Sequence, residues 1–149
     1  MKNKIYLAGD HAGFKLKEKI KPWLEKTYEV IDLGPLKYNS KDDYPDYVVP
    51  LAKRISKEKN SFGIVFAGSG QGEAIAANRV KGVRSVVFYG GSLKIVELSK
   101  KHNNTNILSL GARFLTENQT KKAIQVWLKT KFSEEKRHKT RLRKIEKNT

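Results

Sequence analysis

The segment from Phe62 to Asn78 constrains the fold of this chain more than any other stretch. It begins with the apolar run at residues 64–66, of the kind that is buried in a parallel sheet. Glycine-rich residues 68–72 interrupt the strand, and strong helix formers follow from Glu73 onward. A strand, a glycine loop and a helix N-terminus in this order direct backbone N–H groups toward an anion. Glu73 is unusual because it places a carboxylate where that anion-binding end begins.

Two nucleotide-binding motifs can be compared with this loop, and neither fits. A P-loop ends in Gly-Lys-Ser/Thr, whereas this loop ends in Gly-Gln-Gly-Glu. A dinucleotide fingerprint needs glycine at its sixth position, on the first strand, and an acid about 20 residues further on. Glu73 holds the sixth position, the strand is not the first, and residues 89–92 contain no acid. The loop alone leaves open a ligand site or a tight turn in which Glu73 complements the helix dipole.

Strand-like and helix-like segments alternate along the whole chain. This spacing predicts right-handed βαβ units and an α/β fold. We expect a Rossmann-like three-layer α/β/α sandwich with a parallel five-stranded sheet, in one domain covering residues 1–149, with a basic C-terminal helix. Pro50 is expected in the first turn of its helix. The expected strands are residues 4–8, 28–32, 62–66, 85–89 and 106–110, and the expected helices are residues 14–26, 47–59, 73–78, 93–101, 116–131 and 134–148.

Three clusters of polar residues follow strands of the predicted sheet. Asp10 and His11 follow the first strand, residues 68–73 follow the third, and residues 111–113 follow the fifth. In parallel α/β folds ligands bind outside the carboxyl ends of the strands. The three clusters are therefore expected to face the same edge of the sheet.

Composition excludes several kinds of chemistry. The chain has no cysteine, which rules out disulfides, a thiolate nucleophile and cysteine-based metal sites. No apolar segment reaches the roughly 18 residues that span a bilayer, and the first residues do not resemble a signal peptide. We expect a soluble cytoplasmic protein with no membrane partner.

The net charge of +16 invites a nucleic-acid partner, but its distribution argues against one. Residues 129–149 hold nine Lys or Arg against three Glu, and the remaining excess is scattered lysine. A lysine-rich surface is more often simply solvated, and no nucleic-acid-binding motif is evident.

Six segments, in this order, resemble ribose-5-phosphate isomerase type B and its sugar-phosphate isomerase relatives. The similarity runs from residue 4 to about residue 145. Any one segment is a weak signal, whereas six in register are specific. The matching segments are residues 9–17, 43–45, 68–78, 101–103 and 111–113, together with Arg137, His138 and Arg141.

The resemblance implies an aldose–ketose isomerase that acts through an enediolate. Family members use as base either a cysteine just before the glycine loop or a glutamate just after it. Ala67 holds the first position and Glu73 the second, so this chain resembles the glutamate branch. Glu73, held ionised by the helix N-terminus, would be the base. Backbone donors of the loop would face the enediolate; these loop residues are Gly68, Ser69, Gly70, Gln71 and Gly72.

The remaining roles are also carried over from the family. His102 would open the sugar ring as acid/base. From the sequence alone a residue at the helix C-terminus would be favoured for it, and the family match over residues 101–103 reverses that preference. Asp10 would bind a sugar hydroxyl or serve as an ordinary N-cap. His11 would contact the phosphate, and Asn103 would bind a hydroxyl or form a turn.

One arginine guanidinium group can bind two phosphate oxygens at once, through two parallel hydrogen bonds. Three arginines are candidates for this role. Arg113 follows the fifth strand, whereas Arg137 and Arg141 share one face of the last helix. The alternative for the last two is a solvated basic tail. No metal and no cofactor is expected, since the enediolate has backbone donors and the histidines lack ligand spacing.

The partners implied are a phosphorylated sugar and further copies of the chain. The last helix has only Leu142 and Ile145 as large apolar residues, which is too little to hold it against its own domain. We expect a homodimer or a dimer of dimers with shared active sites, with residues 134–148 packed on a partner. A pentose 5-phosphate is favoured as substrate. The alternatives are allose 6-phosphate, galactose 6-phosphate, or a non-catalytic basic binding subunit.

Overall fold

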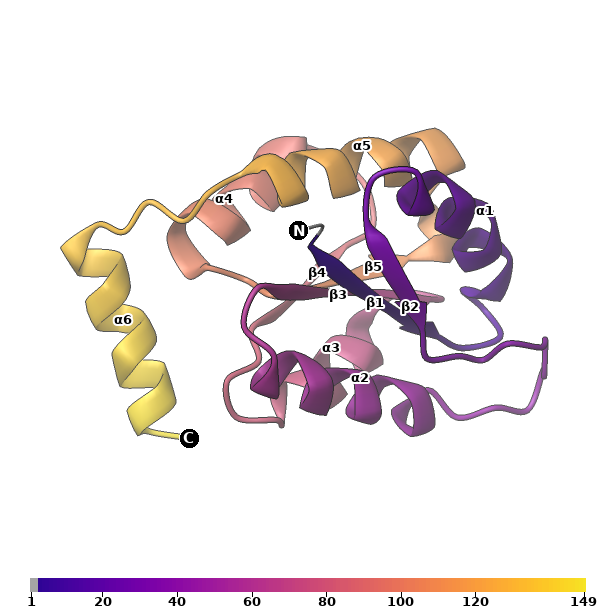
Figure 1. Ribbon diagram of the computed structural model, residues 1–149, viewed down its shortest axis with the longest axis horizontal. Coiled ribbons are helices and arrows are strands. Elements are labelled where there is room, and N and C mark those ends of the chain that lie inside the picture. Colours follow the sequence, from indigo (N-terminus) through magenta and orange to yellow (C-terminus); the bar gives the residue numbers. More distant parts are fainter. Residues whose placement is uncertain (1–2) are drawn as a thin grey trace.

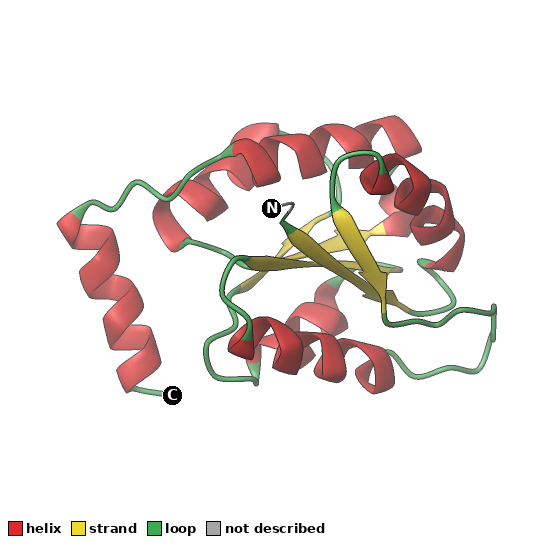
Figure 2. Ribbon diagram, viewed as in Figure 1, coloured by secondary structure: helices red, strands yellow, loops and turns green. Residues whose placement is uncertain are grey.

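A single parallel sheet forms the centre of the computed structural model, which describes residues 3–149 (Figures 1 and 2). Its strands are β1 (Lys4–Gly9), β2 (Glu29–Asp32), β3 (Ser61–Ala67), β4 (Ser85–Phe88) and β5 (Ile107–Gly111). Their order is β2-β1-β3-β5-β4, so the strand before the glycine loop is central and β4 lies at an edge. The predicted five-stranded parallel sheet is confirmed.

Helices cover both faces of the sheet, as Figure 1 shows. They are α1 (Phe14–Glu25), α2 (Pro45–Lys57), α3 (Gln71–Asn78), α4 (Leu93–Asn103), α5 (Glu117–Lys129) and α6 (Lys136–Lys147). On one face Ile20 of α1 and Trp127 of α5 are completely buried, in one core with Val96 of α4. On the other face Leu51 of α2 packs in a second core with Ala77 of α3. The predicted three-layer sandwich is therefore confirmed.

The position of Pro50 differs from the prediction. Helix α2 begins at Pro45, a residue that suits the first turn because it needs no N–H partner there. Pro50 consequently lies inside the helix, not in its first turn. It is exposed, so water can satisfy the helical carbonyl that its missing N–H leaves unpaired.

Helix α6 lies beyond the end of the sandwich, after an extended segment that follows α5 (Figure 1). Arg84 forms an ion pair with Glu146 of this helix, with 3.5 Å between Nη1 and Oε1. His138 is its one buried side chain, and Ile145 is 50% exposed. None of the helices in the described part of the chain has the length and apolar character that crossing a membrane requires.

Two glycines allow the loop after β1 to lie directly on β3. A Cβ at Gly9 would lie 2.4 Å from the carbonyl oxygen of Phe66. A Cβ at Gly13 would lie 2.0 Å from the carbonyl carbon and oxygen of the same residue. Both clashes involve backbone atoms, which cannot turn aside. The two strands therefore end side by side, with the loops that follow them in contact.

We expect Gly13→Ala to lower the free energy of unfolding by about 2 kcal/mol or more, because the added methyl group overlaps the backbone of β3. Urea unfolding followed by circular dichroism measures the change. The exposed Lys19→Ala in α1 serves as control and should change stability by less than about 0.5 kcal/mol. A Gly13→Ala protein as stable as the parent would contradict the close approach.

Candidate active site

Asp10 organises the loop that follows β1. Its Oδ1 accepts hydrogen bonds from the backbone N–H groups of Ala12 and Gly13, at 2.9 and 3.1 Å. Its own backbone N–H donates to the carbonyl of Phe66 in β3, at 3.2 Å. The N-cap residue of α1 is Gly13, so the interpretation of Asp10 as an ordinary N-cap is wrong. Asp10 instead closes the loop, and its buried side chain contacts Glu73.

The glycine loop is held by contacts that only a bare backbone permits. Gly70 has a φ of +79°, which an L-residue with a side chain rarely adopts, and it is the N-cap of α3. Its carbonyl accepts a hydrogen bond of 2.8 Å from the buried hydroxyl of Ser109. A Cβ on Gly72 would lie 2.5 Å from the Tyr44 hydroxyl, so Tyr44 packs directly on the loop. The N-terminus of α3 is thus fixed from two sides.

Glu73 lies in the first turn of α3 and is only 4% exposed. Burial raises its pKa, and the neighbouring Asp10 carboxylate raises it further, to about 7. The sequence suggested that the helix N-terminus would keep this carboxylate ionised. Burial and the charge of Asp10 outweigh that effect. A carboxyl group with a pKa near 7 can both accept and release a proton at neutral pH.

His11 and Arg113 belong to the same edge of the sheet. His11 follows Asp10, and its Nδ1 lies 2.7 Å from Oδ1 of Asp42, a residue of the connection between β2 and α2. Arg113 donates its backbone N–H to the carbonyl of Gly68 at 3.1 Å, and its guanidinium lies over the same glycine. The predicted cluster of Asp10, His11, the glycine loop, Glu73 and Arg113 is therefore assembled within one chain.

The other predicted residues lie at the opposite edge. His102 and Asn103 end α4, whose C-terminus leads into the amino end of β5. Strand β5 has five residues, so the two edges lie roughly 15 Å apart. Arg137 and Arg141 are exposed on α6, and Nε of Arg137 lies 3.0 Å from Glu135. One chain thus does not bring these four residues to Glu73.

His102 is nevertheless held in a defined arrangement at its own edge. Its ring lies on that of His138 in α6, with 4.3 Å between ring centroids and a tilt of 34°. His138 is buried, and its Nδ1 is 2.7 Å from the Ser133 hydroxyl. Burial, and then the proximity of His102, lowers the pKa of His138. Ser133 also donates its backbone N–H to the carbonyl of Lys101 at 2.9 Å, so α4 and α6 are joined at this point.

Sequence reasoning assigned no role to Asp42, Tyr44 or His138. Tyr44 and His138 stood within segments that resemble the family, and that was the available signal. Asp42 carried none, because its contact with His11 joins residues 31 positions apart. No three His, Cys, Asp or Glu side chains within residues 3–149 are grouped as metal ligands would be.

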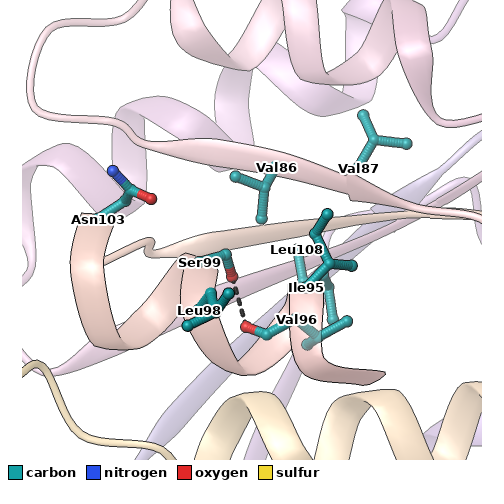
Figure 3. Close-up of a pocket in the computed structure, with 8 residues that line it drawn as sticks. All are labelled: Val86, Val87, Ile95, Val96, Leu98, Ser99, Asn103 and Leu108. Carbon is teal, nitrogen blue, oxygen red and sulfur yellow. Dashed lines mark hydrogen bonds between the residues drawn. The ribbon is translucent and has the colours of Figure 1, made fainter. Parts of the chain in front are cut away.

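A hollow of about 470 Å³ lies between β4 and α4, and Figure 3 shows its lining. None of its lining residues is ionisable, so this surface suits packing better than a reaction. Ile95 on its rim is 65% exposed. The lining residues are Val86, Val87, Ile95, Val96, Leu98, Ser99, Asn103 and Leu108.

Comparison with known proteins gives consistent matches over nearly the whole chain. The model of the Ribose/Galactose Isomerase family matches residues 5–145. Ribose-5-phosphate isomerase B of Mycobacterium tuberculosis is 37% identical over 140 residues, which are 93% of this chain and 85% of that protein.

Solved structures agree with the sequence matches. The structure of ribose-5-phosphate isomerase B from Mycoplasma genitalium, with bound ribulose-5-phosphate, superposes with a TM-score of 0.91 at 37% identity. That match covers 97% of this chain and 95% of the other. Ribose-5-phosphate isomerase B from Clostridium thermocellum has a TM-score of 0.91 at 38% identity, covering 97% and 96% of the two chains.

The raised pKa of Glu73 predicts a stability cost that depends on pH. The group binds its proton more tightly when folded than when unfolded, so its contribution to stability falls as pH rises from the unfolded value through about 7. Glu73→Gln changes the free energy of unfolding, and we expect this change to be more stabilising at pH 8 than at pH 5 by roughly 1–3 kcal/mol. Urea titrations at both pH values measure this difference.

Glu25→Gln, an exposed substitution in α1, is the matched control and should show no such difference between the two pH values. Equal effects of Glu73→Gln at pH 5 and pH 8 would contradict the raised pKa.

Proposed function

The chain belongs to the ribose/galactose isomerase family, and we propose that it interconverts ribose 5-phosphate and ribulose 5-phosphate by aldose–ketose isomerisation. The observation that carries this proposal is the Glu73 carboxyl group, buried beside the glycine loop with a pKa of about 7. The relative solved with bound ribulose-5-phosphate supports a pentose phosphate as substrate.

Glu73 is the proposed base. In the aldose-to-ketose direction its carboxylate removes the proton from C2 of the open-chain sugar, and the electron pair moves to form an enediolate. The hydroxyl proton on O2 of the enediolate passes to O1, so that C2 can become the carbonyl carbon. The carboxylic acid of Glu73 then returns its proton to C1, which leaves the ketose and restores the carboxylate. The pKa of about 7 suits both steps, because the group changes protonation state readily near neutral pH.

The glycine loop and Asp10 support the charge changes at the reacting carbons. Backbone N–H groups at the N-terminus of α3 are proposed to donate to the enediolate oxygens, and the fixed loop needs little reorganisation to do so. Asp10 raises the pKa of Glu73 and is proposed to accept a hydrogen bond from a sugar hydroxyl. Arg113, beside Gly68, is proposed to bind the phosphate.

Ring opening requires a second chain. His102, the proposed acid/base for this step, lies at the amino edge of its own sheet, far from Glu73. In a two-fold symmetric dimer a carboxyl edge of one chain can meet the amino edge of the other, and two equivalent sites result. Asn103, Arg137 and Arg141 of the second chain would arrive with His102 and complete the sugar and phosphate contacts.

The hollow between β4 and α4 is the surface that best suits this second chain (Figure 3). Strand β4 is an edge strand, and the hollow beside it is apolar with Ile95 exposed. Asn103 lines the hollow next to His102, so the surface is continuous with the proposed donor residues. The exposed Ile145 of α6 gives that helix an apolar side to place against the partner.

We expect Glu73→Gln to lower kcat for ribose 5-phosphate by about 10²–10⁴-fold. The Kd of ribose 5-phosphate should be nearly the same for the variant as for the parent protein. In the parent protein kcat/KM should rise with pH through about 7, as Glu73 loses its proton. A coupled assay from pH 5.5 to 8.5 measures this limb, with Glu25→Gln as control. A Glu73→Gln protein with most of the parent kcat would exclude Glu73 as base, and turnover of hexose 6-phosphates alone would reassign the substrate.

Hybrid dimers test the shared site directly. We expect a hybrid of one Glu73→Gln chain and one His102→Ala chain to regain about half of the parent activity, because one of its two sites keeps both groups. Two affinity tags and sequential purification isolate the hybrid. Each single-variant homodimer should stay nearly inactive toward ribose 5-phosphate.

The matched control places both substitutions in one chain and pairs it with an unaltered chain. If the sites are shared, neither site of this second hybrid is complete, and activity is lost. If each chain used its own His102, the second hybrid would keep half the activity and the first none. That reversed pattern, or full activity of a monomer at nanomolar concentration, would refute the shared site.

A further inference from the structure

Asp42 makes a contact that the mechanism above does not use. One carboxylate oxygen, Oδ1, accepts a hydrogen bond from the backbone N–H of His11 at 3.0 Å and lies 2.7 Å from Nδ1 of the same residue. The Asp42 side chain is 3% exposed, whereas that of His11 is 31% exposed. A loop far along the chain thus holds both the main chain and the ring of His11.

This contact determines which ring nitrogen of His11 is available. An ionised carboxylate only accepts hydrogen bonds, so the 2.7 Å contact requires a proton on Nδ1 of His11. Nε2 is then the nitrogen left for a ligand. Because the backbone and the ring are bound to the same oxygen atom, the ring is also fixed in orientation.

The second oxygen of Asp42 indicates that this carboxylate is not placed for stability alone. Oδ2 is buried and has no hydrogen-bond partner among residues 3–149. An unsatisfied buried carboxylate oxygen destabilises a fold, and each such group in a native protein calls for a reason. The local charge balance is also unfavourable for the Asp42 carboxylate, because two further carboxyl groups, those of Asp10 and Glu73, are buried at the same edge of the sheet.

We propose that Asp42 is a positioning residue that presents the Nε2–H of a protonated His11 to the phosphate group of the substrate. The imidazolium then lies between two anions, with the carboxylate behind the ring and the phosphate in front of it. Such a charge-assisted bond is stronger than a neutral one and is directed by the fixed ring. The proposal rests on the proposed function and on the expectation from the sequence that His11 contacts the phosphate.

Inorganic phosphate separates this proposal from the isomerase activity. Its Kd is measured by isothermal titration calorimetry, without turnover, on the full-length protein. We expect Asp42→Ala to raise the Kd of phosphate and the KM of ribose 5-phosphate by about 5–20-fold, with kcat changed less than about 3-fold. Asp42→Asn keeps an acceptor oxygen and should raise the phosphate Kd and the KM by less. This second variant tests the proposal if the alanine variant fails to fold.

Three comparisons complete the test. The exposed Asp46→Asn removes the same charge from the start of α2 and should change neither constant. His11→Asn should raise both constants, and adding Asp42→Ala to it should cause no further rise, because Asp42 acts through the ring. Nitrogen-15 NMR of the imidazole should find Nδ1 protonated in the parent protein.

An unchanged or tighter phosphate Kd in Asp42→Ala, additive effects in the double variant, or a neutral ring protonated on Nε2 would overturn the proposal. Loss of kcat with an unchanged KM would do the same. A protein that binds phosphate in the expected Asp42-dependent manner, yet does not isomerise ribose 5-phosphate, would sustain this inference and refute the proposed function.

Discussion

The burial of two carboxylates against each other, Asp10 and Glu73, is the constraint on which the arrangement of this protein depends. Asp10 directly follows β1, and Glu73 lies in the first turn of the helix after β3. Strands β1 and β3 are neighbours, with Gly9 aligned to Phe66. Their proximity raises the pKa of Glu73 and makes the ionised site costly to fold. The surrounding structure must therefore fix both groups without help from their own interaction.

Backbone contacts supply that support. Gly13 lets the Asp10 loop lie on the main chain of β3, and Gly72 lets Tyr44 lie on the glycine loop. Ser109, from the neighbouring β5, holds the carbonyl of Gly70. Three strands and the connection into α2 thus meet around the Glu73 carboxyl group, and each approach depends on a glycine or a buried hydroxyl.

The direction of the chain explains why the remaining residues lie elsewhere. In a parallel sheet every loop after a strand reaches the carboxyl edge, and every helix returns to the amino edge. His102 ends α4, so it must lie at the amino edge, joined there to α6 through His138. The proposed base and the proposed ring-opening group are therefore on opposite sides of one chain, and a symmetric partner is the simplest way to unite them.

The sequence by itself determined the parallel sheet, the glycine loop and the cluster of Asp10, His11, Glu73 and Arg113, because strand ends and their following residues are local features whose common edge is set by chain direction. It misplaced Pro50 and treated Glu73 as ionised, since helix starts and pKa values depend on neighbours that local patterns do not specify.

Only the tertiary structure decided which distant groups meet. Asp42 reaches His11 across 31 positions, and His138 covers His102 across a helix and a strand. The roles of His102, Asn103, Arg137 and Arg141 remain predictions for a second chain. Such groups meet because of how all the helices and strands pack together. The spacing of residues along the chain therefore does not predict these contacts.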